Sequence, residues 1–138
     1  MISILLPIFN EEKANEFYIE ILEFTQEKSC IFLPNSNNQV ELLYQNIRNE
    51  QIEKYSYLQT DFDKFPLFRY EIKNNFLQFI KKLIDNNVII LTMLSHPGGY
   101  FARIQDPFFN TLEVICEEFD NDDQDSINPN EWDFYQRL

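Results

Sequence analysis

The sequence predicts an α+β domain made of two successive βαβββ modules. The first supporting observation is that one order of elements, a strand, an amphipathic helix and then further strands, recurs in both halves of the chain. The second is a pair of strand-like runs around the turn Asp106-Pro107, which closes the second half. A chain of 138 residues can bury about two thirds of its unfolded surface, so one compact unit holding both modules is expected.

The first module is predicted at residues 1–46. Its apolar opening, Ile2–Phe9, is a strand candidate, and Asn10 can cap a helix whose first turn carries Glu11 and Glu12. Apolar residues then recur at helical spacing, at Ala14, Phe17, Tyr18, Ile21 and Leu22. Strand-like runs follow at 25–29, 30–34 and 40–45, the last after a polar turn at 35–38. We therefore expect an amphipathic helix packed on a sheet.

The second module is predicted at residues 66–118, after a polar, aromatic-rich connector at 47–65. Its elements are a strand at 67–72, a helix at 76–84, a strand at 88–94 and the two strands that flank Asp106-Pro107. Asn74 or Asn75 can cap the start of the helix, and Asn86 and Asn87 stand where it ends. Asn is the non-glycine residue best able to adopt the left-handed conformation of a C-cap, so the helix can end without glycine.

Residues 119–138 follow the modules as an acidic linker and a C-terminal segment. The run 120–125 has no apolar residue to bury and is expected to be solvated. Asn128 can cap a short helix that begins at Pro129, with Trp132, Tyr135 and Leu138 at intervals of three. This helix would dock Trp132 on the same subunit or on a neighbour, and the alternative is a frayed tail.

The composition restricts the partners. Lys and Arg total 11 and Asp and Glu total 23, and the net charge of -12 repels nucleic-acid phosphates and anionic lipid headgroups. No stretch approaches the roughly 20 apolar residues of a membrane span. We therefore expect no nucleic-acid or membrane partner, whereas a cationic small molecule or a basic protein partner suits the charge. Cys30 and Cys116 lie in apolar runs, which is typical of buried thiols in a cytoplasmic protein.

Two segments resemble a known family. The helix Lys13-Ala14-Asn15-Glu16-Phe17-Tyr18 and the segment Gly98–Val114, which contains the Asp-Pro turn and Glu113, are similar to parts of the glyoxalase, bleomycin resistance protein and dioxygenase superfamily. This group is also called the vicinal oxygen chelate superfamily. The resemblance covers residues 2–118 and implies paired half-barrels around a concave site, usually in a homodimer.

The resemblance also places four metal-ligand positions. Family enzymes such as glyoxalase I take one ligand near the start of each module and one carboxylate from the last strand of each. In this sequence the first, second and fourth positions fall on Ser3, Glu41 and Glu113, and the third falls on or beside Leu67. Imidazole supplies much of the affinity of such sites, and neither Ser3 nor Leu67 replaces it. We expect no catalytic residue and no resident cofactor, although Glu41 and Glu113 could bind a divalent metal weakly.

Seven residues are candidates for binding a small-molecule ligand: Glu41, Glu113, Arg69, Arg103, Tyr44, Tyr100 and His96. Two carboxylates that share a pocket need a matching cation, which either arginine could supply. The tyrosines could form walls for a flat or cationic ligand. His96 lies in a loop that often closes over the pocket in relatives. The alternative is that the two carboxylates are solvated on outer faces of their strands.

The chain departs from the family pattern at two glycine positions. Relatives usually have glycine after the first helix and in the Asp-Pro turn, where this sequence has Glu23 and Phe109. We expect Asn110 to take the left-handed turn position instead.

Three functions are compatible with these observations. The first is a metal-independent protein of the glyoxalase/bleomycin-resistance type that sequesters an apolar or cationic small molecule. The second is a divalent-metal-dependent glyoxalase- or dioxygenase-like enzyme whose atypical site uses Glu41, Glu113 and His96. The third is an acidic interaction or immunity-type protein that covers a basic surface. The lost imidazole positions favour the first function over an enzyme.

Overall fold

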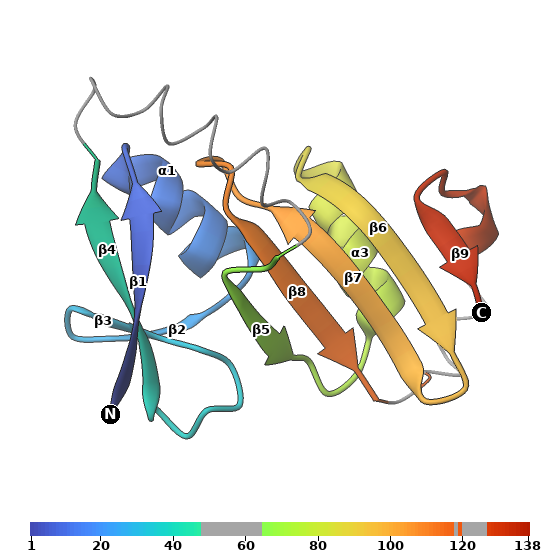
Figure 1. Cartoon of the computed structure of the whole chain (residues 1–138), viewed down its shortest axis with the longest axis horizontal. Coiled ribbons are helices and arrows are strands. Elements are labelled where there is room, and N and C mark those ends of the chain that lie inside the picture. The colour runs from blue at the N-terminus through green and yellow to red at the C-terminus, as the bar shows by residue number, and fades with distance from the viewer. Residues whose placement is uncertain (48–64, 118, 120–126) are drawn as a thin grey trace.

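The computed structural model describes residues 1–47, 65–117, 119 and 127–138 (Figure 1). These residues form two mixed sheets that lie side by side, each with a helical segment packed against it. Most of the predicted connector 47–65, and the acidic run 120–125, lie outside the described residues. None of the described helices is long and apolar enough to cross a membrane.

The first sheet has the strand order β1-β4-β3-β2. Its strands are β1 (Ile2–Ile8), β2 (Thr25–Glu27), β3 (Cys30–Phe32) and β4 (Val40–Asn46). Strand β1 is parallel to β4, and β3 is antiparallel to both of its neighbours. Between β1 and β2 the chain forms the helix α1 (Glu11–Asn15), which continues as the π-helix η1 (Glu16–Ile21). Asn10 caps α1 as predicted, because its side chain accepts a hydrogen bond from the Lys13 backbone N–H at 3.0 Å.

The second sheet repeats this arrangement, with the order β5-β8-β7-β6 followed by an additional edge strand, β9. Its first four strands and its helix are β5 (Phe68–Glu71), α3 (Phe76–Asp85), β6 (Ile89–His96), β7 (Gly99–Gln105) and β8 (Thr111–Cys116). Strand β5 is parallel to β8, as β1 is to β4. In each module the first strand lies beside the fourth, so the predicted repeat of two βαβββ modules is confirmed.

The C-terminal segment corrects one prediction. Asn128 caps a single 3-10 turn, η2 (Pro129–Glu131), but the chain is extended at Trp132, with φ -95° and ψ 125°, where the sequence pattern predicted a helix. It continues as β9 (Tyr135–Arg137), which pairs in parallel with the edge strand β6. Pairing with this edge satisfies backbone donors and acceptors that a single short helix would leave to water. Residues 135–137 therefore belong to the second sheet.

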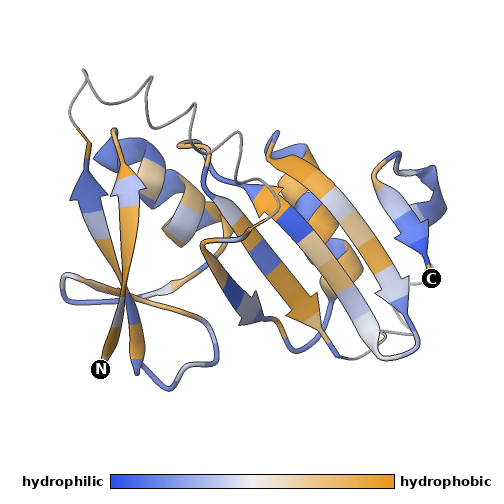
Figure 2. Cartoon of the chain, in the orientation of Figure 1, coloured by the Kyte–Doolittle hydropathy of each residue, from blue (hydrophilic) through white to orange (hydrophobic). Residues whose placement is uncertain are grey.

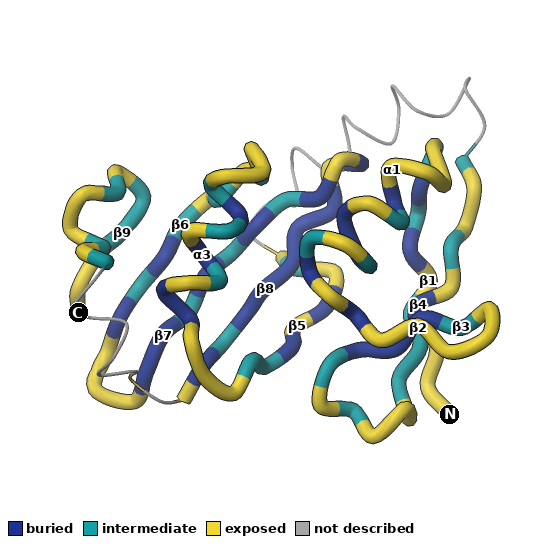
Figure 3. Tube along the Cα trace, turned by 180° about the vertical axis from the view of Figure 1, so that it is seen from behind, coloured by how far each residue is buried: buried dark blue, intermediate teal, exposed yellow. Residues whose placement is uncertain are grey.

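Each sheet has one face covered by a helix and one face that we call the open face. Figure 3, seen from behind, places α1 and α3 in front of the strands, and Figure 1 shows the same helices behind them. Alternate strand residues that face the helices are fully buried, among them Leu6, Ile8, Ala102, Leu112 and Val114. The residues between them point to the open face, where polar and charged side chains can be placed.

A buried hydrogen-bond network joins the two modules. The Tyr18 hydroxyl of η1 donates to Asp106 Oδ2 at 2.6 Å, and Asn110 Nδ2 donates to the same oxygen at 2.8 Å and to the Pro7 carbonyl of β1 at 3.0 Å. The backbone N–H groups of Phe108 and Asn110 donate to Asp106 Oδ1, each at 2.8 Å. The Asp-Pro turn of the second module is thus bonded to both the first strand and the helix of the first module.

The glycine departures are accommodated by strained residues. Glu23 follows η1 with φ 59°, and Phe109 takes the left-handed position in the Asp-Pro turn with φ 70°. The prediction that Asn110 takes this position is wrong, because Asn110 does not have a positive φ; its side chain instead bonds to Asp106 and to the Pro7 carbonyl. Asn87, with φ 58°, ends α3 without glycine as expected.

We expect Glu23→Gly to raise the free energy of unfolding by about 0.5–1 kcal/mol, because glycine relieves the left-handed strain that Glu23 carries. The substitution loses the exposed ion pair between Glu23 and Lys82, which contributes little. Glu20→Gly is the matched control: it removes the same charge from an exposed position inside η1 and should destabilise by about 1 kcal/mol. Urea denaturation measures both. A loss of stability in Glu23→Gly equal to that in Glu20→Gly would contradict the strain assigned to Glu23.

Tyr18→Phe should destabilise the protein more at about pH 8 than at about pH 5. Burial raises the pKa of Asp106 to about 6, and the hydrogen bond from Tyr18 opposes that rise. Without this donor the pKa of Asp106 rises further, so the variant takes up a proton more readily and recovers part of its stability as the pH falls. We expect a loss of about 1–3 kcal/mol at the higher pH.

Tyr44→Phe provides the control for this pH dependence. In the unmodified protein the Tyr44 hydroxyl donates to the Asn15 side-chain oxygen at 2.8 Å, and an amide does not titrate in this range. Guanidinium chloride denaturation of both variants at the two pH values should give a pH-dependent loss for Tyr18→Phe alone. The same loss at both pH values in Tyr18→Phe would show that Asp106 is not the group linked to Tyr18.

Candidate functional site

Glu113 is the centre of the candidate site on the open face of the second sheet. It lies on β8, with Arg69 of β5 and Arg103 of β7 directly opposite it on the two neighbouring strands. Arg69 Nε lies 3.1 Å from Glu113 Oε1, and Arg103 Nε lies 3.4 Å from Glu113 Oε2. Only 11% of the Glu113 side chain is exposed. Each oxygen of this largely buried carboxylate therefore faces its own guanidinium group.

The three side chains carry a local excess of positive charge. Two guanidinium groups surround one carboxylate, in a chain whose net charge is -12. The guanidinium carbon of Arg103 also lies 5.6 Å from the centroid of the Phe101 ring, within range of a cation–π interaction. Figure 2 shows the corresponding hydrophilic bands on β5, β8 and β7.

The first sheet has an analogous pair of opposite residues, in which a hydroxyl group takes the place of the guanidinium group. Ser3 on β1 is opposite Glu41 on β4, and the Ser3 hydroxyl donates to Glu41 Oε1 at 2.7 Å. In the second sheet the residue opposite Glu113 on the equivalent strand is Arg69. Arg69 lies two residues beyond Leu67, on or beside which the resemblance placed the third ligand position. The partner of the last-strand carboxylate is thus a hydroxyl group in the first sheet and a guanidinium group in the second.

The donors at these positions do not fit a resident divalent metal. The oxygens of Glu113 face cations, Glu41 shares an oxygen with a serine, and Arg69 offers no lone pair. Within the part of the chain that the structure describes, no group of three or more His, Cys, Asp or Glu side chains is arranged to hold a metal ion.

The two candidate tyrosines lie away from Glu113. Tyr44 bonds to Asn15 of α1, and burial, with a smaller contribution from the charge of Glu11, raises its pKa to about 12. Tyr100 stacks on Phe76 of α3, with ring centroids 5.0 Å apart and an interplanar angle of 2°. Strand alternation explains this, since Tyr100 and Arg103 are three residues apart on β7 and so point to opposite faces.

Phe101 is the aromatic residue that the sequence analysis missed at this site, because its apolar character is equally typical of the core. The available signal was its spacing of two from Arg103, which places both side chains on one face of β7.

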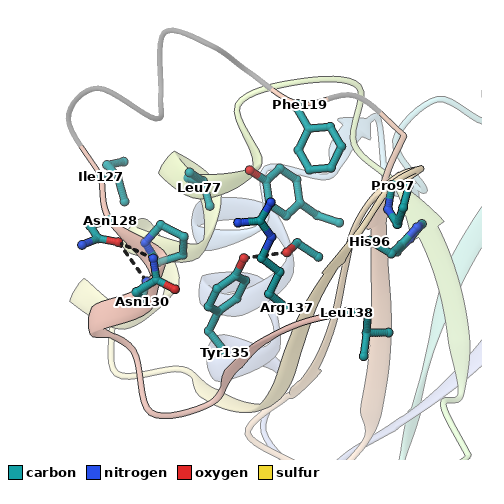
Figure 4. A pocket seen from close by; sticks show the side chains of 13 residues that line it. Leu77, His96, Pro97, Phe119, Ile127, Asn128, Asn130, Tyr135, Arg137 and Leu138 are labelled. Carbon is teal, nitrogen blue, oxygen red and sulfur yellow. Dashed lines mark hydrogen bonds between the residues drawn. The ribbon is translucent and has the colours of Figure 1, made fainter.

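A pocket of about 490 Å³ lies at the other end of the second sheet, between α3, β6 and the C-terminal segment. Figure 4 shows its lining, which includes Leu77, His96, Phe119, Tyr135 and Arg137, and Tyr100 also borders it. His96 Nδ1 accepts a hydrogen bond from the Gly98 backbone N–H at 3.0 Å. The structure thus brings His96 and Tyr100 together, but in this pocket and not beside Glu113. Its C-terminal wall depends on β9, which the sequence did not predict.

The sequence matches no protein-family model and no curated protein. Solved structures resemble it. A glyoxalase/dioxygenase from Nostoc punctiforme superposes with a TM-score of 0.62 at 14% identity, covering 85% of this chain and 90% of that chain. The genomically encoded fosfomycin resistance protein FosX from Listeria monocytogenes superposes with a TM-score of 0.61 at 9% identity, and the match covers 86% of this chain and 93% of that chain. TnmS3, an antibiotic binding protein from a Streptomyces species, superposes with a TM-score of 0.54 at 16% identity, and the match covers 84% of this chain and 93% of that chain. At these identities the likeness establishes the fold alone.

Glu113→Gln should destabilise the protein by about 1–2 kcal/mol at low ionic strength, because two guanidinium groups lose their shared counterion. The loss should shrink in about 1 M NaCl, which screens the remaining repulsion. Glu41→Gln is the matched control on the first sheet and should change stability by less than about 0.5 kcal/mol, since Gln still accepts from Ser3. Thermal unfolding at the two salt concentrations measures both. Equal, salt-independent effects of the two substitutions would contradict the charge balance assigned to Glu113.

Proposed function

We propose that this protein, which has the vicinal oxygen chelate fold, is a small-molecule-binding protein that works on its open face without a resident metal. The observation that carries the proposal is the pair of arginines beside Glu113 on β8, at the position where the family resemblance expects a metal ligand. In metal-dependent relatives that carboxylate is a metal ligand, whereas here Arg69 and Arg103 hold Glu113 from both sides. A guanidinium group neutralises a carboxylate and can hydrogen-bond a ligand, but it supplies no Lewis acid for catalysis. Binding is therefore favoured over an enzymatic reaction.

The structural neighbours support a ligand-binding function of this kind. One is an antibiotic binding protein and another is a fosfomycin resistance protein, and both match this chain over most of their length. The fold thus accommodates small molecules in proteins of closely similar size. We propose sequestration as the consequence of binding for this chain.

We further propose that the working form is a homodimer in which a second copy covers the open faces. Apolar side chains are exposed on that side of the first sheet: Leu5 is 56% exposed on β1, and Leu43 is 42% exposed on β4. They are direct neighbours across the parallel strand pair. Exposed apolar pairs on a sheet face are more stable when another protein surface covers them. A second copy would also enclose a ligand that one open sheet leaves in solvent.

A ligand screen with metal control tests the proposal. Purified protein is dialysed against EDTA and its melting temperature is measured alone, with Mn²⁺, Ni²⁺ or Zn²⁺, and with a panel of aromatic and aliphatic small molecules. We expect no stabilisation by the metals and a rise of several degrees with at least one organic ligand, since a ligand at about 100 times its Kd adds about 2.7 kcal/mol. Stabilisation by a metal, or ligand binding only after metal is restored, would contradict metal independence. Sedimentation equilibrium of the same sample tests the dimer.

A further inference from the structure

We infer that the open face of the second sheet binds a ligand with an anionic group, such as a carboxylate on a flat apolar body, and that Arg103 is its principal contact. This inference rests on the proposed function and specifies the chemical class of its ligand. It differs from the cationic ligand that the net charge of the whole chain suggested, because the charges immediately around Glu113 have the opposite sign.

The hydrogen-bonding capacity of the two arginines supports an anionic ligand. Each guanidinium group has five N–H donors, and one carboxylate cannot satisfy ten. Arg103 Nε is buried, and its 3.4 Å approach to Glu113 is an ion pair without hydrogen-bond geometry, so this donor has no hydrogen-bond partner among the described residues. The Arg103 side chain remains 28% exposed and that of Arg69 57% exposed, so both can still reach a ligand from the open face. A second anion is the group that completes this arrangement.

Strand register places an apolar surface next to the charged one. One row across the sheet consists of three apolar residues that are directly opposite one another: Leu94 on β6, Phe101 on β7 and Ile115 on β8. The charged row of Arg103, Glu113 and Arg69 lies two residues along the strands, a distance of about 6.5–7 Å on the same face. The ring of Phe101 approaches the guanidinium group of Arg103 where the two rows meet. A molecule with a flat apolar body and a carboxylate spans both rows.

One acidic neighbour fixes where the anion lies. Glu71 ends the apolar row on β5, opposite Ile115 and on the same strand as Arg69. A ligand anion close to β5 would meet the charge of Glu71, whereas Phe101 is two strands away, about 9–10 Å across the sheet. The favourable position is therefore at Arg103 and Phe101. We expect Arg103 to contribute more to affinity than Arg69.

Three probes of one shape and different charge test this inference. They are 1-naphthoate, 1-naphthalenemethanol and 1-naphthylmethylammonium, titrated into the full-length protein at constant ionic strength. The readout is the ¹H–¹⁵N NMR spectrum, including the arginine Nε–Hε signals. We expect naphthoate to shift the Arg103 side-chain signal and the Phe101 amide, and to bind at least about tenfold more tightly than the ammonium probe.

Matched arginine substitutions complete the experiment. Arg103→Gln should weaken naphthoate binding at least about tenfold, and Arg69→Gln should weaken it less. Arg137→Gln removes the same charge from the pocket at the other end of the sheet and should leave the affinity unchanged. Thermal unfolding of each variant checks that it is folded.

Three kinds of result would overturn the inference. Binding of the ammonium or alcohol probe at Phe101 as tightly as naphthoate, or unchanged naphthoate binding in Arg103→Gln, would overturn the anionic specificity while leaving small-molecule binding intact. Naphthoate shifts confined to His96 and Arg137 would place the anion in the other pocket. If none of the three probes binds, the inference fails, and the separate ligand panel decides whether the proposed function fails with it.

Discussion

The arrangement of the candidate site depends on one constraint, the parallel pairing of the first and last strands in each module. This pairing sets Ser3 beside Glu41 in the first sheet and Arg69 beside Glu113 in the second. Residues that are directly opposite on neighbouring strands share a face and lie within reach of one another. The chemistry of the site is therefore decided by which residue types occupy these two pairs of positions and by Arg103, which is opposite Glu113 on β7. In this chain one pair is a hydrogen-bonded serine and glutamate, and the other is an ion pair.

The second requirement is that the modules keep a fixed relation to each other, and a buried carboxylate provides it. Asp106 accepts hydrogen bonds from the helix of the first module and from its own turn, while Asn110 reaches across to the first strand. Because burial of an unpaired carboxylate is unfavourable, each of these donors stabilises the assembled state more than an exposed hydrogen bond would. The turn that holds Asp106 leads directly into β8, so the network also fixes the strand that carries Glu113.

The sequence predicted the features that local chemistry decides. Asn10 and Asn128 were recognisable as helix caps because a cap needs only a side-chain oxygen at the right spacing. The position of Arg69 could not be predicted in this way, since the register of β5 against β8 joins residues more than forty apart. Phe101 and Tyr100 are adjacent aromatic residues that both suit a core, so only their alternation relative to Arg103 could indicate that Phe101 shares the face of that arginine. Strand β9 depends on the free edge of β6, which no local pattern reveals.

A crystal structure of the protein grown in excess Mn²⁺ and measured at an energy where manganese scatters anomalously would test the central claim most directly. The claim is that guanidinium groups, and not a metal, neutralise the carboxylate of Glu113 on β8. The account predicts no anomalous peak near Glu113 and both arginines still paired with its oxygens. An anomalous peak for a manganese ion coordinated by Glu113, with Arg69 and Arg103 turned away into solvent, would contradict it.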